Sequence, residues 1–134
     1  MAAKTDCYVD TGALIAFLDR SDSHHARFRQ LFSKPPALAT SALVIAEGHG
    51  WFLRRYDRLR AIQFLAFIAA LPRLAIHPFD TAALATAGAV VKKFSDHELT
   101  LADAHGIAIM SERRMAVCWS TDRHLSLGGA SLVI

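Results

Sequence analysis

Four carboxylates carry the chemistry that this sequence can support: Asp10, Glu47, Asp103 and Asp122. Asp10 and Asp122 stand where an apolar run gives way to a helix start, and Asp103 lies in the first turn of a helix. Glu47 lies inside a largely apolar helical segment. Two carboxylates ~4 Å apart repel by roughly 4 kcal/mol at an effective dielectric of about 20. If the fold gathers all four, either their pKa values rise or a cation binds between them.

A cluster made only of oxygen ligands favours a hard divalent ion, Mg²⁺ or Mn²⁺, which carboxylates usually hold together with a substrate phosphate. Hydrolysis of phosphodiester bonds is the natural chemistry of such a site. Simpler explanations exist for each acid: Asp10 and Asp122 as helix caps, Asp103 as a first-turn acid favoured by the helix dipole, and Glu47 as an exposed helix residue. The other acids lie in polar segments typical of solvated turns and caps, and we leave them out of the site: Asp6, Asp19, Asp22, Asp96 and Glu98.

Strand-like and helix-like segments alternate along the chain. We expect strands at 7–9, 37–40, 74–77 and 116–120, with a short edge strand at 131–134. Helices are expected at 12–18, at 22–32 with Asp22 as its cap, from Ser41 to a break at 56–57, from there to 71, and from 78 through 93. A last helix starts at Thr100 with a sequence similar to a capping box, which puts Asp103 in its first turn.

Repeated β-then-α order predicts an α/β fold: a parallel sheet with helices on both faces. In such sheets ligands bind beyond the carboxyl ends of the strands. Asp10 and Asp122 follow strands directly, and Asp103 begins a helix that can face the same crevice, so the pattern itself predicts that these acids converge. With 134 residues, 53% of them hydrophobic, the chain fits one domain spanning 1–134.

The composition permits a polyanionic partner without demanding one, since the formal net charge is only +3. Cys7 and Cys118 both fall in strand-like apolar runs, so we expect buried thiols rather than a disulfide or a zinc pair. The amino-terminal residues lack the apolar core of a secretory signal. The uncharged stretch 61–71 is too short to cross a bilayer, which needs about 20 residues. We therefore expect a cytoplasmic protein.

Several enzyme classes are excluded by missing motifs, among them serine hydrolases with a GxSxG elbow and nucleotide binders with a GxGxxG or P-loop sequence. The seven histidines show no HExxH pair. His24 and His25 fit structural or surface positions. His49 and His105 lie two residues beyond Glu47 and Asp103 and should face away from them. His124 could approach a phosphate, but a surface position is the preferred interpretation.

A basic run in the middle of the chain is interleaved with aromatic residues: Arg54, Arg55, Arg58 and Arg60 near Trp51, Phe52 and Tyr56. Such a run can contact an RNA backbone and stack on bases. The alternative is a helical hairpin whose aromatic face packs inward while its arginines are solvated. Gly48 and Gly50 are interpreted only as a flexible spot in this helix.

The chain resembles the PIN-domain ribonucleases, specifically the VapC-like toxins of toxin–antitoxin pairs. The resemblance rests on motifs in family order: 9–14 (VDTGAL), Asp22 with His25, Thr40-Ser41 followed by Glu47, 101–104 (LADA) and 120–124 (STDRH). It implies a three-layer α/β/α fold with a central parallel sheet of four to five strands. It also implies RNA as the substrate and hydrolysis by a water that Mg²⁺ or Mn²⁺ activates.

The same resemblance assigns the metal ligands and catalytic residues to Asp10, Glu47, Asp103 and Asp122, with Thr11 and Thr121 orienting carboxylates or waters. It implies an antitoxin protein as partner and a homodimer. The antitoxin would occupy a groove on the helices of the middle region, leaving Phe64, Leu65 and Phe67 partly exposed. Two alternatives stay open: a noncatalytic PIN-like module that binds RNA or protein, and a PIN nuclease of RNA maturation without a toxin role.

Overall fold

Five short parallel strands form the centre of the computed structural model, which describes residues 7–133. Their bounds are β1 (Cys7–Val9), β2 (Leu38–Ser41), β3 (Leu74–His77), β4 (Val117–Trp119) and β5 (Ser131–Val133). They are ordered β3-β2-β1-β4-β5 in the sheet, and every neighbouring pair is parallel. The predicted parallel sheet of four to five strands is therefore confirmed.

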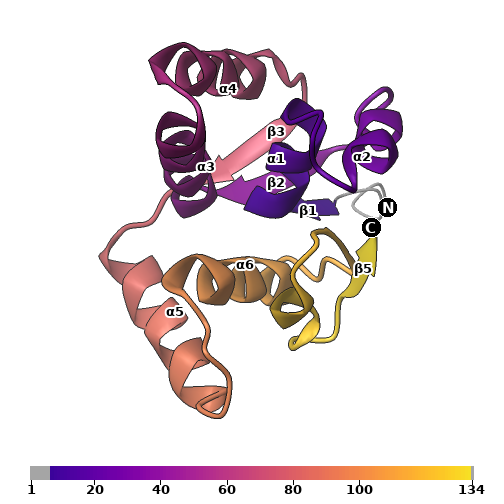
Figure 1. Cartoon of the computed structure of the whole chain (residues 1–134). Helices are drawn as coiled ribbons and strands as arrows, with labels where there is room; N and C mark the ends of the chain where they lie inside the picture. The colour runs from indigo at the N-terminus through magenta and orange to yellow at the C-terminus, as the bar shows by residue number, and fades with distance from the viewer. Residues whose placement is uncertain (1–6, 134) are drawn as a thin grey trace.

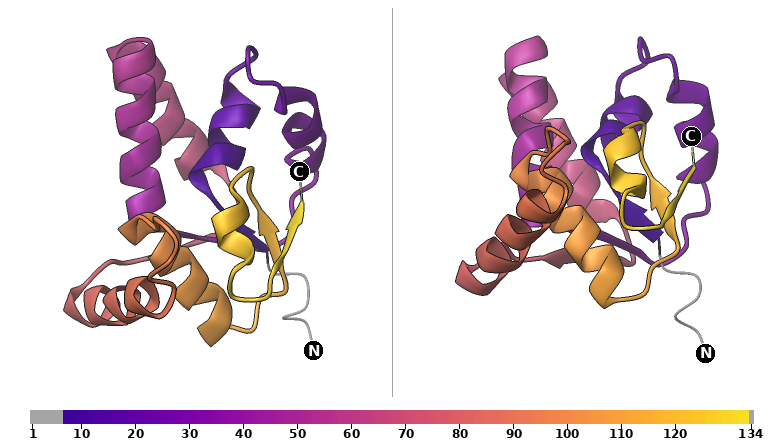
Figure 2. Two further views of the ribbon diagram at one scale, coloured as in Figure 1. Left: turned by 60° about the horizontal axis from the view of Figure 1, so that its bottom comes forward. Right: turned by 90° about the horizontal axis from the view of Figure 1, so that it is seen from below.

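Helices cover both faces of this sheet. Their bounds are α1 (Thr11–Leu18), α2 (His25–Leu31), α3 (Ala42–Arg55), α4 (Arg58–Ala70), α5 (Thr81–Lys93) and α6 (Leu101–Glu112), and a 3₁₀ helix, η2 (Arg123–Ser126), follows β4. Figure 1 shows α1, α3 and α4 on one side of the sheet and α5 with α6 on the other. Helix α5 packs on α6 and lies at the outside of the molecule (Figure 2), so that Ala87 is the buried residue of α5. The three-layer α/β/α fold is confirmed.

The two hydrophobic cores follow from the alternation of side chains along the strands. On β1, Val9 faces the core formed with α1, α3 and α4, whereas Tyr8 faces the core formed with α6. The Tyr8 ring lies directly against Gly106 of α6, where a Cβ atom would come within 2.9 Å of it. Glycine at that position therefore lets α6 lie close to the sheet.

The direction in which the chain adds strands to the sheet reverses between β1 and β4. From β1 the chain moves outward to β2 and β3, and after two helices it returns to place β4 on the other side of β1. Such a switch point leaves a crevice at the carboxyl ends of the two strands. Asp10 directly follows β1 and Asp122 lies three residues after β4, so both acids are at this crevice.

Two expectations about the segment before α2 were wrong. Asp22 does not cap a helix from 22; α2 begins at His25, and the Asp22 carboxylate accepts a hydrogen bond from the His24 amide (2.8 Å) in the preceding turn. Asp19 is not a solvated turn residue, because it is only 8% exposed and accepts a hydrogen bond from Tyr56, which lies between α3 and α4. His25 is structural, since its Nδ1 lies 2.8 Å from the Ala16 carbonyl oxygen.

The expectation that Phe64 is partly exposed was also wrong. Its ring is fully buried between α4 and α3 and lies over Gly48, where a Cβ atom would be 2.4 Å from it. Gly48 is therefore a close-packing position and not a flexible spot. Leu65 is exposed and Phe67 is half-buried, as expected.

The cysteine and membrane predictions can also be compared with the fold. Cys118 is buried, and burial raises the pKa of its thiol, whereas Cys7 is only partly buried, contrary to expectation. No helix among residues 7–133 is long and apolar enough to cross a membrane. Asp6 and Ile134, the end of the expected edge strand, lie outside the described residues.

Candidate active site

All four predicted carboxylates line one pocket of about 370 Å³ at the switch point. Asp10 comes from the start of α1, Glu47 from the second turn of α3, Asp103 from the first turn of α6, and Asp122 from the segment after β4. The other residues of the pocket wall include both predicted threonines: Thr11, Gly12, Ile15, Trp51, Arg54, Thr100 and Thr121. Segments far apart in the sequence thus meet where the strands end.

Asp10 is the most buried of the four acids, with 5% of its surface exposed. It stands at the N-cap position of α1, yet its side chain makes no capping hydrogen bond. Instead, its Oδ2 accepts a hydrogen bond from the Ser120 hydroxyl (2.9 Å). Burial raises the pKa of Asp10 to about 7, and the charges of Asp103 and Glu47 add to the rise. Capping thus does not explain why a carboxylate is held here.

Asp103 and Asp122 both have local structural roles in addition to their place in the pocket. Asp103 completes the predicted capping box, because its Oδ2 accepts the Thr100 amide (3.2 Å) while its own amide donates to the Thr100 hydroxyl (3.1 Å). Asp122 caps η2 by accepting the His124 amide at Oδ1 (2.9 Å). Burial, followed by the nearby Asp122 charge, raises the pKa of Asp103. The two caps hold the carboxylates in place without neutralising them.

Glu47 and the two threonines complete the arrangement. Glu47 is exposed on α3, and its Oε1 accepts a hydrogen bond from the Thr11 hydroxyl. Thr11 therefore orients the carboxylate of Glu47, across 36 residues of sequence. Thr121 lines the pocket with its Oγ1 over Gly12, where a Cβ atom would be 2.5 Å from that oxygen. The absence of a side chain at Gly12 thus lets the loop after β4 close onto α1.

Two residues of this site were missed in the sequence. His124 lies against the acids: its Nδ1 is 3.5 Å from Asp122 Oδ1 and 3.7 Å from Asp103 Oδ2. Ser120 is fully buried, and its hydroxyl joins Asp10 to the loop of Asp122, whose amide donates to it (2.9 Å). A sequence signal was present in both cases, because polar residues flank Asp122 directly after an apolar strand.

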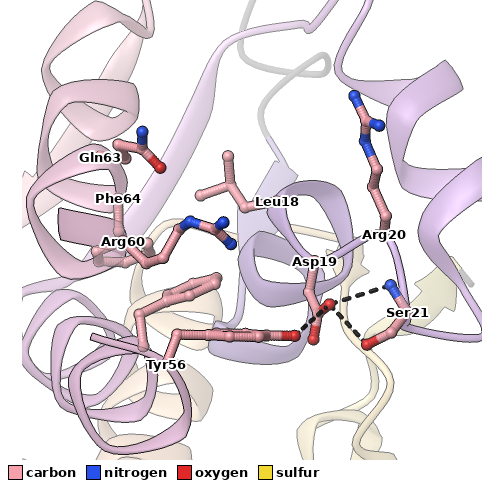
Figure 3. Close-up of a pocket in the computed structure, with 9 residues that line it drawn as sticks. Leu18, Asp19, Arg20, Ser21, Tyr56, Arg60, Gln63 and Phe64 are labelled. Atoms are coloured by element: carbon pink, nitrogen blue, oxygen red, sulfur yellow. Dashed lines mark hydrogen bonds between the residues drawn. The ribbon is translucent and has the colours of Figure 1, made fainter. Parts of the chain in front are cut away.

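A larger hollow of about 560 Å³ lies apart from the acids, and none of its lining residues belongs to the acid pocket. Figure 3 shows Asp19 at its wall, where Oδ1 accepts hydrogen bonds from the Ser21 amide (3.0 Å), the Ser21 hydroxyl (2.7 Å) and the Tyr56 hydroxyl (2.9 Å). Burial opposes ionisation of Asp19, but these hydrogen bonds outweigh it and lower the pKa. This carboxylate joins α1 to the α3–α4 turn and is already satisfied.

The donor set of the acid pocket fits a divalent cation. Four carboxylates offer only oxygen ligands, which suit Mg²⁺ and Mn²⁺. Burial and neighbouring carboxylates raise the pKa values of Asp10 and Asp103, and a bound cation would favour their ionised forms. Asp103, Asp122 and His124 each offer a ligand atom, and these three atoms lie within 4.8 Å of one another.

Comparisons with known proteins agree with this architecture. A sequence model of the PIN domain matches residues 7–127. Among solved structures, the chain is similar to VapC20 of Mycobacterium tuberculosis, a toxin that cleaves the sarcin–ricin loop (TM-score 0.84, 21% identity, covering 93% of this chain and 96% of that one). It is also similar to VapBC2 of Rickettsia felis bound to promoter DNA (TM-score 0.64, 15% identity, 96% and 97% covered). A toxin–antitoxin complex from Klebsiella pneumoniae gives a TM-score of 0.62 at 17% identity, with 96% of each chain covered. No curated protein matches the sequence.

Proposed function

We propose that this chain, which belongs to the PIN-domain family, is a metal-dependent endoribonuclease and the toxin of a toxin–antitoxin pair. The observation that carries the proposal is the meeting of four carboxylates from four separate elements in one pocket. Asp10 is buried there with its pKa raised to about 7. A binding module gains nothing from assembling mutually repelling acids, whereas a metal-dependent nuclease requires them.

In this proposal Asp10, Glu47, Asp103 and Asp122 hold Mg²⁺ or Mn²⁺. When bound, such an ion supplies a water of lowered pKa and screens the charge that builds on the phosphate. The protein's own contribution is to position the ligands. Ser120 fixes Asp10 by a hydrogen bond, and Thr11 fixes Glu47. These contacts set the carboxylate orientations before any ion arrives.

RNA would enter along α3. Trp51 and Arg54 lie four and seven residues after Glu47, on the same helix face, and both line the acid pocket. An arginine beside the acids can contact the phosphate backbone, and a half-buried indole offers a face for base stacking. Arg55 and Arg60 instead lie near the Tyr56 ring, at 5.7 and 5.5 Å from its centroid. In the basic run, Arg54 is therefore available to RNA, whereas Arg55 and Arg60 contact the Tyr56 ring of the helical hairpin.

As a toxin, the chain would bind an antitoxin protein, form a homodimer and act in the cytoplasm. The structural neighbours from Rickettsia felis and Klebsiella pneumoniae are toxin–antitoxin assemblies, which supports a protein partner here. Exposed apolar residues on α3 and α4 offer a surface for one: Leu53, Leu59, Ile62 and Leu65. A nuclease of RNA maturation, which shares the chemistry, would lack this partner.

The deciding experiment is RNA cleavage by the purified chain. Total RNA, tRNA and a sarcin–ricin loop oligonucleotide are incubated with Mg²⁺, Mn²⁺ or EDTA, beside the Asp103→Asn variant. Asparagine keeps the side-chain volume and an oxygen that can accept the Thr100 amide, so the fold should persist while a ligand charge is lost. We expect cleavage at discrete sites that needs metal and is absent in the variant. RNA binding without cleavage under all conditions would favour the noncatalytic module.

The role of Arg54 has a matched control. Arg54→Gln should weaken RNA binding and reduce the salt dependence of binding by about one ion, because one phosphate contact is lost. Arg58→Gln changes an exposed arginine that does not line the acid pocket and should have a smaller effect. Equal losses in both variants would show that Arg54 acts only through the net charge of the surface.

A further inference from the structure

The imidazole of His124 faces two of the four acids, although sequence spacing gave it a surface position. Its Nδ1 lies 3.5 Å from Asp122 Oδ1 and 3.7 Å from Asp103 Oδ2. These separations exceed those of a normal hydrogen bond, which joins heavy atoms at about 2.7–3.2 Å. They do match two ligands of one ion, since atoms bound at about 2.1 Å can be up to about 4.2 Å apart.

The backbone holds this imidazole in place. The amide of His124 donates to Asp122 Oδ1 (2.9 Å), which fixes the first turn of η2 against the carboxylate. Leu125, the next residue, is fully buried in the core below α6. The His124 side chain itself is 35% exposed, so it reaches the pocket from the solvent side. His124 is therefore held through its own amide and through the buried residue that follows it.

We propose that His124 is a nitrogen ligand of the metal, bound through Nδ1 beside Asp103 and Asp122. The inference rests on the proposed metal-dependent function and gives it a metal preference. Imidazole suits borderline transition ions, whereas Mg²⁺ strongly favours oxygen ligands. A site with one imidazole therefore selects Mn²⁺ over Mg²⁺ more strongly than four carboxylates would. His97, whose ring packs edge-on against that of His124 (centroids 5.9 Å apart), is not part of the ligand group.

The test is pulsed electron paramagnetic resonance on Mn²⁺ bound to the full chain, which detects ¹⁴N coupling from a coordinated imidazole. The unmodified chain should show this coupling, His124→Gln should lose it, and His97→Gln should keep it. Titration calorimetry should show the Mn²⁺ affinity of His124→Gln reduced by about tenfold or more. Its Mg²⁺ affinity should change far less, because Mg²⁺ gains little from nitrogen.

The outcomes separate this inference from the proposed function. Mn²⁺ that binds the unmodified chain without ¹⁴N coupling would overturn the role of His124 and leave the metal-dependent nuclease standing. Coupling that persists in His124→Gln, or that disappears in His97→Gln, would also overturn it. If Mn²⁺ does not bind the unmodified chain at all, the inference fails together with the metal dependence of the proposed function.

Discussion

The buried carboxylate of Asp10 should make the metal-free protein less stable at neutral pH than in mild acid. Burial, aided by the charges of Asp103 and Glu47, raises its pKa from the ordinary 3.8 to about 7. The folded protein then binds a proton that the unfolded chain releases between about pH 4 and pH 7, so stability falls as the pH rises. At about 1.4 kcal/mol for each pKa unit, the loss amounts to about 4 kcal/mol above pH 7 and is absent below about pH 4.

The variant Asp10→Asn removes this ionisation and leaves an amide oxygen that can still accept the Ser120 hydroxyl. In EDTA it should be more stable than the unmodified protein by about 4 kcal/mol at pH 8, and the two should be nearly equal at pH 4. Urea unfolding followed by circular dichroism at several pH values between 4 and 8 measures the difference. EDTA is needed because a bound cation would offset the carboxylate charge.

The comparison isolates Asp10 from the other acids. Asp103, whose pKa is also raised by burial and by Asp122, titrates in both proteins, so its own burial contribution cancels and only its electrostatic interaction with Asp10 remains in the difference. A stability difference between Asp10→Asn and the unmodified protein that stays constant from pH 4 to pH 8 would refute the reasoning.

Two other predictions concern packing and the hydrogen bond across the helices. Gly48→Ala puts a Cβ atom 2.4 Å from the buried Phe64 ring and should lower the free energy of unfolding in urea by about 1–3 kcal/mol. Gly88→Ala, with nothing within 4 Å of the added atom, should raise it by roughly 0.5–1 kcal/mol. Equal effects at both glycines would contradict the close packing at Gly48. Tyr56→Phe removes the 2.9 Å hydrogen bond to Asp19 and should cost about 1–2 kcal/mol, a loss that should vanish in an Asp19→Ala background, which lacks the acceptor oxygen, if the two side chains act as a pair.

Local signals in the sequence were sufficient for the strands and for the convergence of Asp10, Asp103 and Asp122, whereas Glu47 was assigned to the site by the family resemblance. A carboxylate directly after an apolar strand marks the carboxyl edge of a parallel sheet, so the places of Asp10 and Asp122 followed from the β-then-α order alone. The capping box at Thr100 and Asp103 was equally local, since both hydrogen bonds lie within one turn. These are features in which the sequence neighbours of a residue are also its spatial neighbours.

Expectations failed where a distant residue decided the outcome. Phe64 was expected to be partly exposed because the family resemblance implied an antitoxin groove on these helices, and nothing near it in sequence reveals that Gly48 leaves room for its ring. Asp19 stands in a polar segment, and its burial depends on a tyrosine 37 residues away. His124 was placed at the surface because the 3₁₀ turn that aims it at Asp103 cannot be read from helical spacing. Tertiary contacts of this kind leave no periodicity in the sequence.

The pairing of β1 with β4 has a consequence for how the protein is made. The hydrogen bond between Asp10 and Ser120 joins residues 110 positions apart, and a chain is synthesised and folds from its amino terminus. Until β4 has emerged and paired, the growing chain carries Asp10 and Glu47 but lacks the loop that brings Asp122 to them. The complete set of four carboxylates is therefore assembled only after β4 and the loop of Asp122 have been synthesised, so the proposed nuclease would be inactive as a partly synthesised chain.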